Sequence, residues 1–238
     1  MKIYTGTSGF GYKEWKGNFY PEKISGKKML AYYSSRLETV EINNTFYRMP
    51  TANMLKSWAE QVPKGFLFAI KAPQVITHIK RLQNVGEETR FFLGSISTLG
   101  NKLGCALFQF PASFHEDLKL LQGFLDLIPP KIPCAFDFRS SSWLNPGTYA
   151  LLSKRKFCLG IEDTDEKPIT GITSIAPWGY FRMRRADYTS SGLEECAEKV
   201  LSQEWKKAFV FFKHEDDAAA KGPQLAMSFR DLVNQPQV

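Results

Sequence analysis

The chain alternates between short apolar segments and longer segments in which apolar residues recur three and four positions apart. Short apolar runs are typical of buried parallel strands, and the three-and-four spacing is typical of amphipathic helices. Regular alternation of the two predicts a parallel α/β fold. The predicted strands are residues 2–6, 39–42, 66–70, 104–108, 134–136, 157–161, 179–181 and 208–212.

Helical spacing follows all but one of the predicted strands. Repeated strand–helix units of this number predict a single (β/α)8 TIM-type barrel, in which the carboxyl ends of all strands face one basin. The sixth unit is the exception, because residues 166–178 carry no helical period, so we expect a loop or a degenerate helix around strand 6. The predicted helices are residues 29–37, 51–62, 86–100, 115–128, 145–155, 191–203 and 218–233.

Length and composition fit one globular domain. The chain has 238 residues, of which 43% are hydrophobic and 23% are charged, close to the roughly 250 residues of a typical barrel of this type. We expect one domain over residues 1–234 and a short tail over 235–238. The first residues lack the apolar core of a signal peptide, and no apolar run approaches the ~18 residues of a membrane span. These features predict a cytoplasmic protein without a membrane partner, and they leave the oligomeric state open.

The charge balance favours anionic partners. A net charge of +7 attracts phosphate-bearing ligands or nucleic acid, but the chain has neither a basic stripe nor an RNA-binding motif, so nucleic acid is the less favoured partner. The four cysteines form no C-x-x-C pair, which gives zinc or dithiol chemistry little support. We expect them to be reduced and to pack as small apolar side chains.

The turn after the first strand, GTSGFGYKEWKGNFYP, is rich in glycine and aromatic residues. Glycine lets the backbone approach a ligand closely, and aromatic rings supply a contact surface. The turn forms either the wall of a binding pocket or a plug packed over the barrel mouth. In the first case Ser8, Tyr12 and Trp15 contact the substrate.

The segment EINNTFY contains the strongest local signal. Glu41 and Asn43 are two residues apart, so in a strand their side chains share one face, while Val40 and Ile42 face the helices. Glu41 is then a general acid or base, a metal ligand, or a member of a buried ion pair with Lys71 or an arginine. We expect Asn43 and Tyr47 to contact the substrate.

Polar residues also end the third and fourth predicted strands. Lys71 could have a lowered pKa and act as a base or a Schiff-base nucleophile, or it could stay charged and hold an anion. Pairing with Glu41 would oppose a lowered pKa, so anion binding is the preferred role. His78 is a candidate for acid–base work or for structural capping, and Gln109 places an amide at the rim.

The later strands supply two arginines and a lysine. Asp137 and Arg139 are two residues apart and form a salt bridge, or they present a guanidinium group to a phosphate or carboxylate while Asp137 acts in catalysis. Arg182 follows the seventh strand, and we expect an anion near Arg139 and Arg182 with Lys71 on its other side. Lys213 and His214 are candidate substrate contacts.

Three acids follow Lys213 and His214, and they could bind a divalent ion together with Glu41 or Glu162. The spacing matches no metal motif, so we expect no metal ligands and no cofactor, with a divalent metal as a weak alternative.

Several of these motifs also recur, in this order, in one known family. On them the chain resembles the YecE-like family, a domain of unknown function, over nearly its whole length. The resemblance implies a TIM-type barrel without an established activity. The family usually has Glu at position 137 and His-Gly at positions 183–184, where this chain has Asp and Met-Arg. The motifs are GTSGFGYKEWKGNFYP, YY, VEINNTFYRMP, IKAP, ITH, LFQFP, FDFR before SSSW, and FFKHEDD.

Together these features predict a TIM-barrel enzyme that uses acid–base or hydrolytic chemistry on a small anionic, possibly phosphorylated, substrate at the C-terminal rim. Fold alone does not name the reaction, because this architecture hosts many chemistries. A nucleic-acid-associated protein and a non-catalytic small-molecule-binding protein are the alternatives. Binding that falls steeply with salt would favour nucleic acid.

Overall fold

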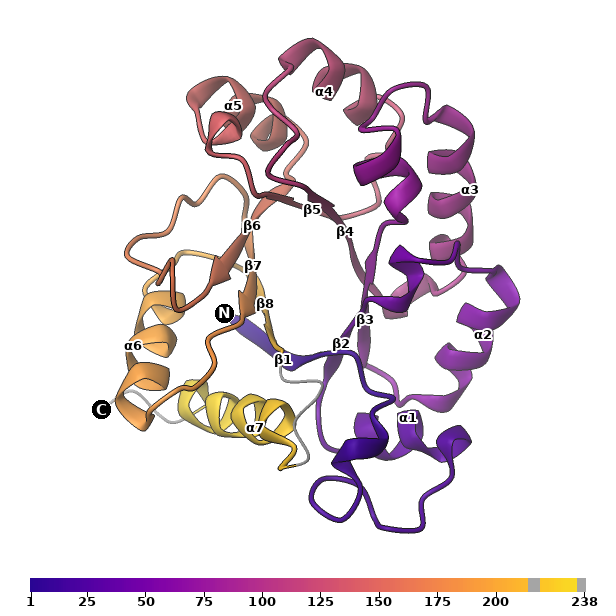
Figure 1. Cartoon of the computed structure of the whole chain (residues 1–238), viewed down its shortest axis with the longest axis vertical. Coiled ribbons are helices and arrows are strands. Elements are labelled where there is room, and N and C mark those ends of the chain that lie inside the picture. The colour runs from indigo at the N-terminus through magenta and orange to yellow at the C-terminus, as the bar shows by residue number, and fades with distance from the viewer. Residues whose placement is uncertain (214–218, 235–238) are drawn as a thin grey trace.

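The strands form one closed parallel barrel. In a computed structural model, which describes residues 1–213 and 219–234, each strand pairs with the next and β8 pairs with β1 (Figure 1). The predicted (β/α)8 TIM-type barrel is therefore confirmed. The strands are Lys2–Ser8 (β1), Thr39–Ile42 (β2), Leu67–Lys71 (β3), Leu103–Phe110 (β4), Cys134–Phe138 (β5), Cys158–Asp163 (β6), Trp178–Met183 (β7) and Lys207–Phe212 (β8).

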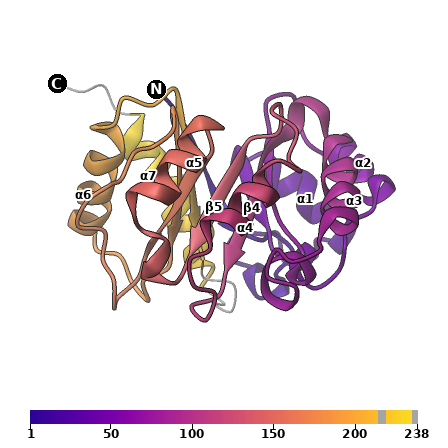
Figure 2. The same cartoon turned by 90° about the horizontal axis from the view of Figure 1, so that it is seen from above.

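Helices surround the barrel as an outer layer, which the view from above also shows (Figure 2). Most begin at a polar cap: the Asp117 carboxylate accepts the backbone N–H of Leu120 at the start of α4, which satisfies an otherwise unpaired donor. The α-helices of the described residues are Gly26–Ser34 (α1), Ala52–Gln61 (α2), Gly86–Ser97 (α3), Leu118–Leu125 (α4), Pro146–Lys154 (α5), Ser190–Leu201 (α6) and Lys221–Val233 (α7).

Irregular structure replaces a helix between β6 and β7. The chain passes from Asp163 to Trp178 without a helical residue, which confirms the degenerate sixth unit predicted from the missing apolar period. After several other strands, a short helical turn precedes the α-helix and carries residues of the barrel mouth. These turns are Lys13–Trp15 (η1), Asn44–Phe46 (η2), the π-helix Val75–Ile79 (η3), and Ser141–Trp143 (η5).

Strand side chains divide between two cores. Inside the barrel, Ala69, Leu107, Tyr180 and Phe209 pack together. Outside it, the side chains of alternate residues pack against the helices, in the cluster that contains Val40 and Ile42 among others. The buried thiols of Cys105, Cys134, Cys158 and Cys196 are unpaired. Because the barrel is filled with apolar side chains below, its polar inward residues gather at the carboxyl ends of the strands.

β1 and β2 pass close to each other at Gly6. A methyl group at this position would lie 2.0 Å from the Thr39 carbonyl oxygen, a backbone atom that cannot move alone. We expect Gly6→Ala to lower the free energy of unfolding by about 1–3 kcal/mol, the usual cost of overpacking. Urea unfolding followed by circular dichroism measures this, and Gly94→Ala on α3, where the added methyl group meets open space, is the matched control.

Candidate functional site

Glu41 lies at the centre of the barrel mouth and is fully buried. Its Oε1 accepts hydrogen bonds from the Ser8 hydroxyl at 2.8 Å, the Asn43 amide at 3.0 Å and Arg182 Nη2 at 3.0 Å. Its Oε2 accepts from the Tyr180 hydroxyl at 2.6 Å and from Arg182 Nε at 2.9 Å. The structure thus pairs Glu41 with an arginine and not with Lys71.

The donors around Glu41 keep it ionised. Burial alone raises the pKa of this carboxyl, but the charge of Arg182 and its hydrogen bonds outweigh burial, and the pKa is held well below its usual range. Bidentate pairing with a guanidinium group favours the charged form in the same way. Glu41 therefore carries a fixed negative charge near neutral pH.

Arg182 links Glu41 to a chain of polar groups on β5, β4 and β3. Its Nη1 donates to Asp137 Oδ2 at 3.1 Å, and the same carboxylate oxygen accepts from the Gln109 amide at 2.7 Å. The other end of that amide, Gln109 Oε1, accepts from Lys71 Nζ at 2.7 Å. Arg182 is only 1% exposed, so its guanidinium group organises the mouth from within.

Lys71 ends this chain and is half-buried. No carboxylate of residues 1–213 and 219–234 lies within ion-pair distance of its amine. The ammonium group instead lies 4.3 Å from the centre of the Phe46 ring. Burial, together with the positive charges of Arg182 and Arg184, lowers the pKa of Lys71 to about 8, although Glu41 acts in the opposite direction.

His78 lies against the Phe46 ring that the Lys71 amine also contacts. The π-helix η3 carries it, and π-helical turns are frequent at functional sites. The imidazole packs edge-on against Phe46, with ring centres 4.8 Å apart, and Nδ1 lies 2.9 Å from the Thr77 hydroxyl. Burial, followed by the charges of Lys71 and Arg139, lowers the pKa of His78. The imidazole is therefore neutral near pH 7.

Arg184 and Glu162 form a further ion pair at the mouth. Arg184 Nε lies 2.8 Å from Glu162 Oε1, and Arg182 Nη1 lies 3.8 Å from the same oxygen. Burial and the charge of Arg182 lower the pKa of Arg184. Arg184 stands where the resemblance implied glycine, and its half-buried guanidinium group adds positive charge above Arg182.

The structure joins most of the predicted site residues and separates others from them. Ser8, Glu41, Asn43, Lys71, Gln109, Asp137 and Arg182 form one hydrogen-bonded chain, and His78 contacts it through Phe46. Arg139 follows β5 and is exposed. Its guanidinium group makes no ion pair with Asp137, whose carboxylate binds Arg182 instead.

The aromatic candidates lie around the edge. Trp15 is 1% exposed and packs against Tyr12 and Tyr20, the packing role that was the alternative to ligand contact. The Tyr12 hydroxyl donates to the Ser8 carbonyl. Tyr47 is 77% exposed. Lys213 directly follows β8 and is half-buried, while His214 and the three acids after it lie outside the described residues.

Sequence reasoning missed two aromatic contributors. Tyr180 donates to Glu41 from β7, and Phe46 separates Lys71 from His78. The two-residue step from Tyr180 to Arg182 on one strand was a usable signal, because both side chains must then face the barrel interior. Phe46 carried no such signal, since a short helical turn and not a strand positions it.

The described residues contain no group of three or more His, Cys, Asp or Glu side chains that could hold a metal ion. The carboxylates at the mouth bind arginines instead. No helix of the described part is long and apolar enough to cross a membrane.

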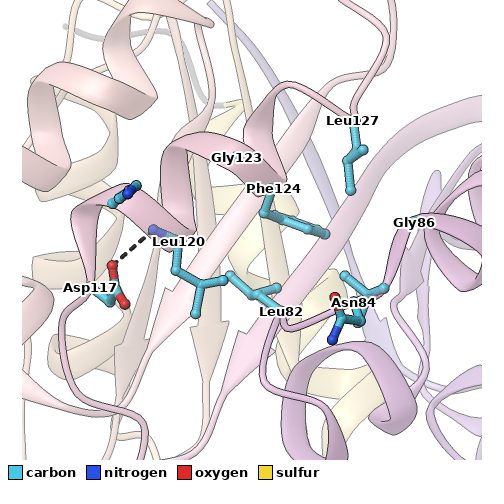
Figure 3. Close-up of a pocket in the computed structure, with 10 residues that line it drawn as sticks. Leu82, Asn84, Gly86, Asp117, Leu120, Gly123, Phe124 and Leu127 are labelled. Atoms are coloured by element: carbon cyan, nitrogen blue, oxygen red, sulfur yellow. Dashed lines mark hydrogen bonds between the residues drawn. The ribbon is translucent and has the colours of Figure 1, made fainter.

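Three cavities differ in whether they touch the barrel mouth. A cleft of about 490 Å³ is lined by Asp137, Arg139 and Glu162, among others, and a smaller one of about 230 Å³ lies beside Asn43. Figure 3 shows a third, of about 470 Å³, between α4 and the segment before α3, lined by apolar groups such as Leu120 and Phe124. Only the first two touch the hydrogen-bonded chain of the mouth, so the third is a separate surface groove.

Fold and site define a (β/α)8 barrel with a charged, hydrogen-bonded mouth at the carboxyl ends of its strands. The family model described as "Protein of unknown function DUF72" matches residues 4–238, and the chain belongs to this family. The predicted membership of the YecE-like family is thereby confirmed.

Relatives and solved structures agree with this assignment. The chain is 33% identical over 156 residues to UPF0759 protein YunF of Bacillus subtilis, covering 62% of this chain and 54% of that protein. It is 29% identical over 123 residues to UPF0759 protein YecE of Escherichia coli K12, covering 51% and 45%. The matches thus span about half the length of these curated relatives.

The crystal structure of a DUF72 family protein from Thermotoga maritima superposes with a TM-score of 0.84 at 27% identity, covering 99% of this chain and 100% of that one.

Proposed function

We propose that the barrel mouth is the active site of an enzyme that binds a small anionic molecule and exchanges a proton with it at Lys71. One observation carries this proposal: a half-buried amine with a pKa of about 8 lies at the mouth without a carboxylate partner among the described residues. Both protonation states of such an amine are populated near neutral pH, which suits it to general acid–base catalysis.

The surrounding groups would have distinct roles. Gln109 Oε1 holds the Lys71 amine in place. Glu41 and Asp137, which the sequence suggested as acid–base groups, hold the buried Arg182 instead, so they act as positioning residues in this proposal. The neutral imidazole of His78 is the second group able to accept or donate a proton.

The positive charge of the rim supports an anionic substrate. Burial lowers the pKa of Lys71 most, and the charges of Arg182 and Arg184 lower it further, while Glu41 and Asp137 oppose them. A bound phosphate or carboxylate would relieve that repulsion and stabilise the ammonium form. The net charge of +7 would bring such ligands toward the protein.

Competitive acetylation tests this proposal. We expect trace labelling with acetic anhydride to modify Lys71 with a midpoint near pH 8, because only the neutral amine is a nucleophile. Inorganic phosphate should slow labelling of Lys71 several-fold, since it stabilises the ammonium form and covers the amine. Peptide mass spectrometry measures both effects.

Lys206 is the matched control. It is exposed and precedes β8 at the opposite end of the barrel, so its labelling should not respond to phosphate. Equal labelling of Lys71 and Lys206 at pH 8, with no effect of phosphate on either, would remove the basis for the proposed function.

A further inference from the structure

The barrel wall is incompletely paired between β5 and β6. Here only Ala135 pairs with Cys158 and Phe136 with Leu159. By contrast, β4 and β5 stay paired as far as Phe110 and Phe138, and β6 and β7 as far as Asp163 and Met183. The upper halves of β5 and β6 therefore separate, on the side of the barrel where Asp137 lies.

The two strands diverge only beyond Gly160 and Asp137, which directly follow the last paired residues. A methyl group on Gly160 would lie 2.9 Å from the Asp137 Cβ, so glycine allows the two strands to pass closely before they diverge. No helix of the described residues follows β6, and an irregular loop extends beside it toward the outside of the barrel (Figure 1). The outer face of this gap is therefore lined by loop residues.

The gap holds the cleft of about 490 Å³, a size within the roughly 300–1,000 Å³ range of small-molecule sites. Its inner wall includes Asp137 and Glu162, the carboxylates that bind Arg182 and Arg184. The cleft and the barrel mouth thus share a wall. At this wall the hydrogen-bonded chain runs from Lys71 through Gln109 to Asp137.

The outer walls of the cleft carry four hydroxyl side chains beside apolar ones such as Leu144 and Leu159. Ser141 of η5 and Tyr149 of α5 line one side, and Thr164 and Thr173 of the loop after β6 line the other. Hydroxyl groups both donate and accept hydrogen bonds. A lining of this kind complements a ligand that itself carries several hydroxyl groups.

Two cationic side chains of the cleft lining belong to no ion pair of the described residues. Arg139 and Lys167 line the cleft, and neither makes an ion pair within residues 1–213 and 219–234. Glu166 is the one lining carboxylate outside the arginine pairs of the described residues. Arg139 and Lys167 are therefore available to bind a phosphate.

We infer that this cleft between β5 and β6 binds the unreactive part of the substrate, and that this part is polyhydroxylated and phosphorylated, as in a sugar phosphate. The inference rests on the proposed function, because it assigns the reacting end of the same molecule to Lys71. Arg139 and Lys167 bind the phosphate, and the hydroxyl groups of the cleft bind the sugar.

Glucose 6-phosphate is the probe for this site, with binding measured by isothermal titration calorimetry. Thr173→Trp places an indole in the cleft from an exposed loop position and is expected to weaken binding about tenfold, equivalent to loss of about one or two hydrogen bonds. Thr170→Trp, in the same loop but outside the cleft lining, should change affinity less than about twofold.

Arg139→Ala tests the phosphate contact. It should weaken glucose 6-phosphate binding about tenfold or more, as expected for loss of a charge-assisted hydrogen bond, and leave the affinity for unphosphorylated glucose unchanged. An equal loss for both sugars would overturn the phosphate assignment. Equal affinities of Thr173→Trp and Thr170→Trp, or no binding of glucose 6-phosphate to the unaltered protein, would overturn the cleft assignment.

Acetylation of Lys71 separates this inference from the proposed function. If glucose 6-phosphate protects Lys71 equally in Thr173→Trp and Thr170→Trp, the assignment of the cleft is overturned and the proposed function of the mouth stands. If Thr173→Trp weakens binding but glucose 6-phosphate does not protect Lys71 in the unaltered protein, a ligand in the cleft is supported and the role of Lys71 is overturned. Protection that is lost in Thr173→Trp supports both.

Discussion

Glu41→Gln should be the most destabilising conservative change at the barrel mouth, lowering the free energy of unfolding by about 3 kcal/mol. Removing one partner of a buried ion pair costs about 3–5 kcal/mol because the other charge is left uncompensated. We expect the lower end of that range, since Asp137 still binds Arg182. The glutamine amide nitrogen would also face donors that now point at a carboxylate oxygen. Urea unfolding followed by circular dichroism measures the loss.

Glu195→Gln is the control for this change. Glu195 lies on α6, its carboxylate is 71% exposed, and its nearest cationic partner is Lys199 at 4.0 Å. Pairs this exposed contribute about 0–1 kcal/mol, so its unfolding curve should scarcely move. A Glu41→Gln protein as stable as the Glu195→Gln protein would show that the buried pair does not organise the fold.

Stability should fall steeply in acid because of the same carboxylate. The pKa of Glu41 in the folded protein lies well below its unfolded value of 4.5, so the unfolded state takes up the proton first as the pH falls. The stabilisation is fully present above about pH 4.5 and is lost progressively below it. Below that point the slope from this one group is about 1.4 kcal/mol per pH unit.

Urea unfolding of the unaltered protein and of Glu41→Gln between pH 3 and pH 6 measures this contribution. The difference in unfolding free energy between the two proteins should be constant above about pH 5 and shrink as the pH falls, because unfolded Glu41 takes up a proton and glutamine does not. A difference that is independent of pH down to pH 3 would contradict the low pKa of Glu41.

The positions of the strands and the inward direction of Glu41 could be predicted because strand geometry is local. Two-residue alternation fixes which side chains face the interior, and parallel closure brings all strand ends together. Gln109 was expected at the rim because it ends the fourth predicted strand. Strand alternation and barrel closure therefore predict which residues meet at the mouth.

Partner choice within that set could not be predicted. Arg182 is 141 residues from Glu41 in sequence, and its two-sided guanidinium group takes both Glu41 and Asp137. This leaves Lys71 without a carboxylate partner among the described residues. Glu41 does oppose a lowered pKa of Lys71, as expected, but burial and the two arginines outweigh it. The assignment depends on distances across the barrel that no local pattern encodes.

Loop residues were the other limit. Arg139 follows β5 beyond the last paired residue, so strand alternation no longer fixes its direction. Trp15 belongs to a turn whose aromatic side chains pack on one another, and composition alone does not separate a packed ring from one that contacts a ligand.

Direct measurement of the Lys71 pKa tests the central claim that the mouth holds a reactive amine in an anion-binding site. Heteronuclear NMR of lysine side chains, with the Lys71 signal assigned from Lys71→Met, should give a pKa near 8 in the absence of ligand and a higher pKa with inorganic phosphate, because an anion stabilises the ammonium form. A pKa near the ordinary lysine value of about 10.4, unchanged by phosphate, would contradict the account.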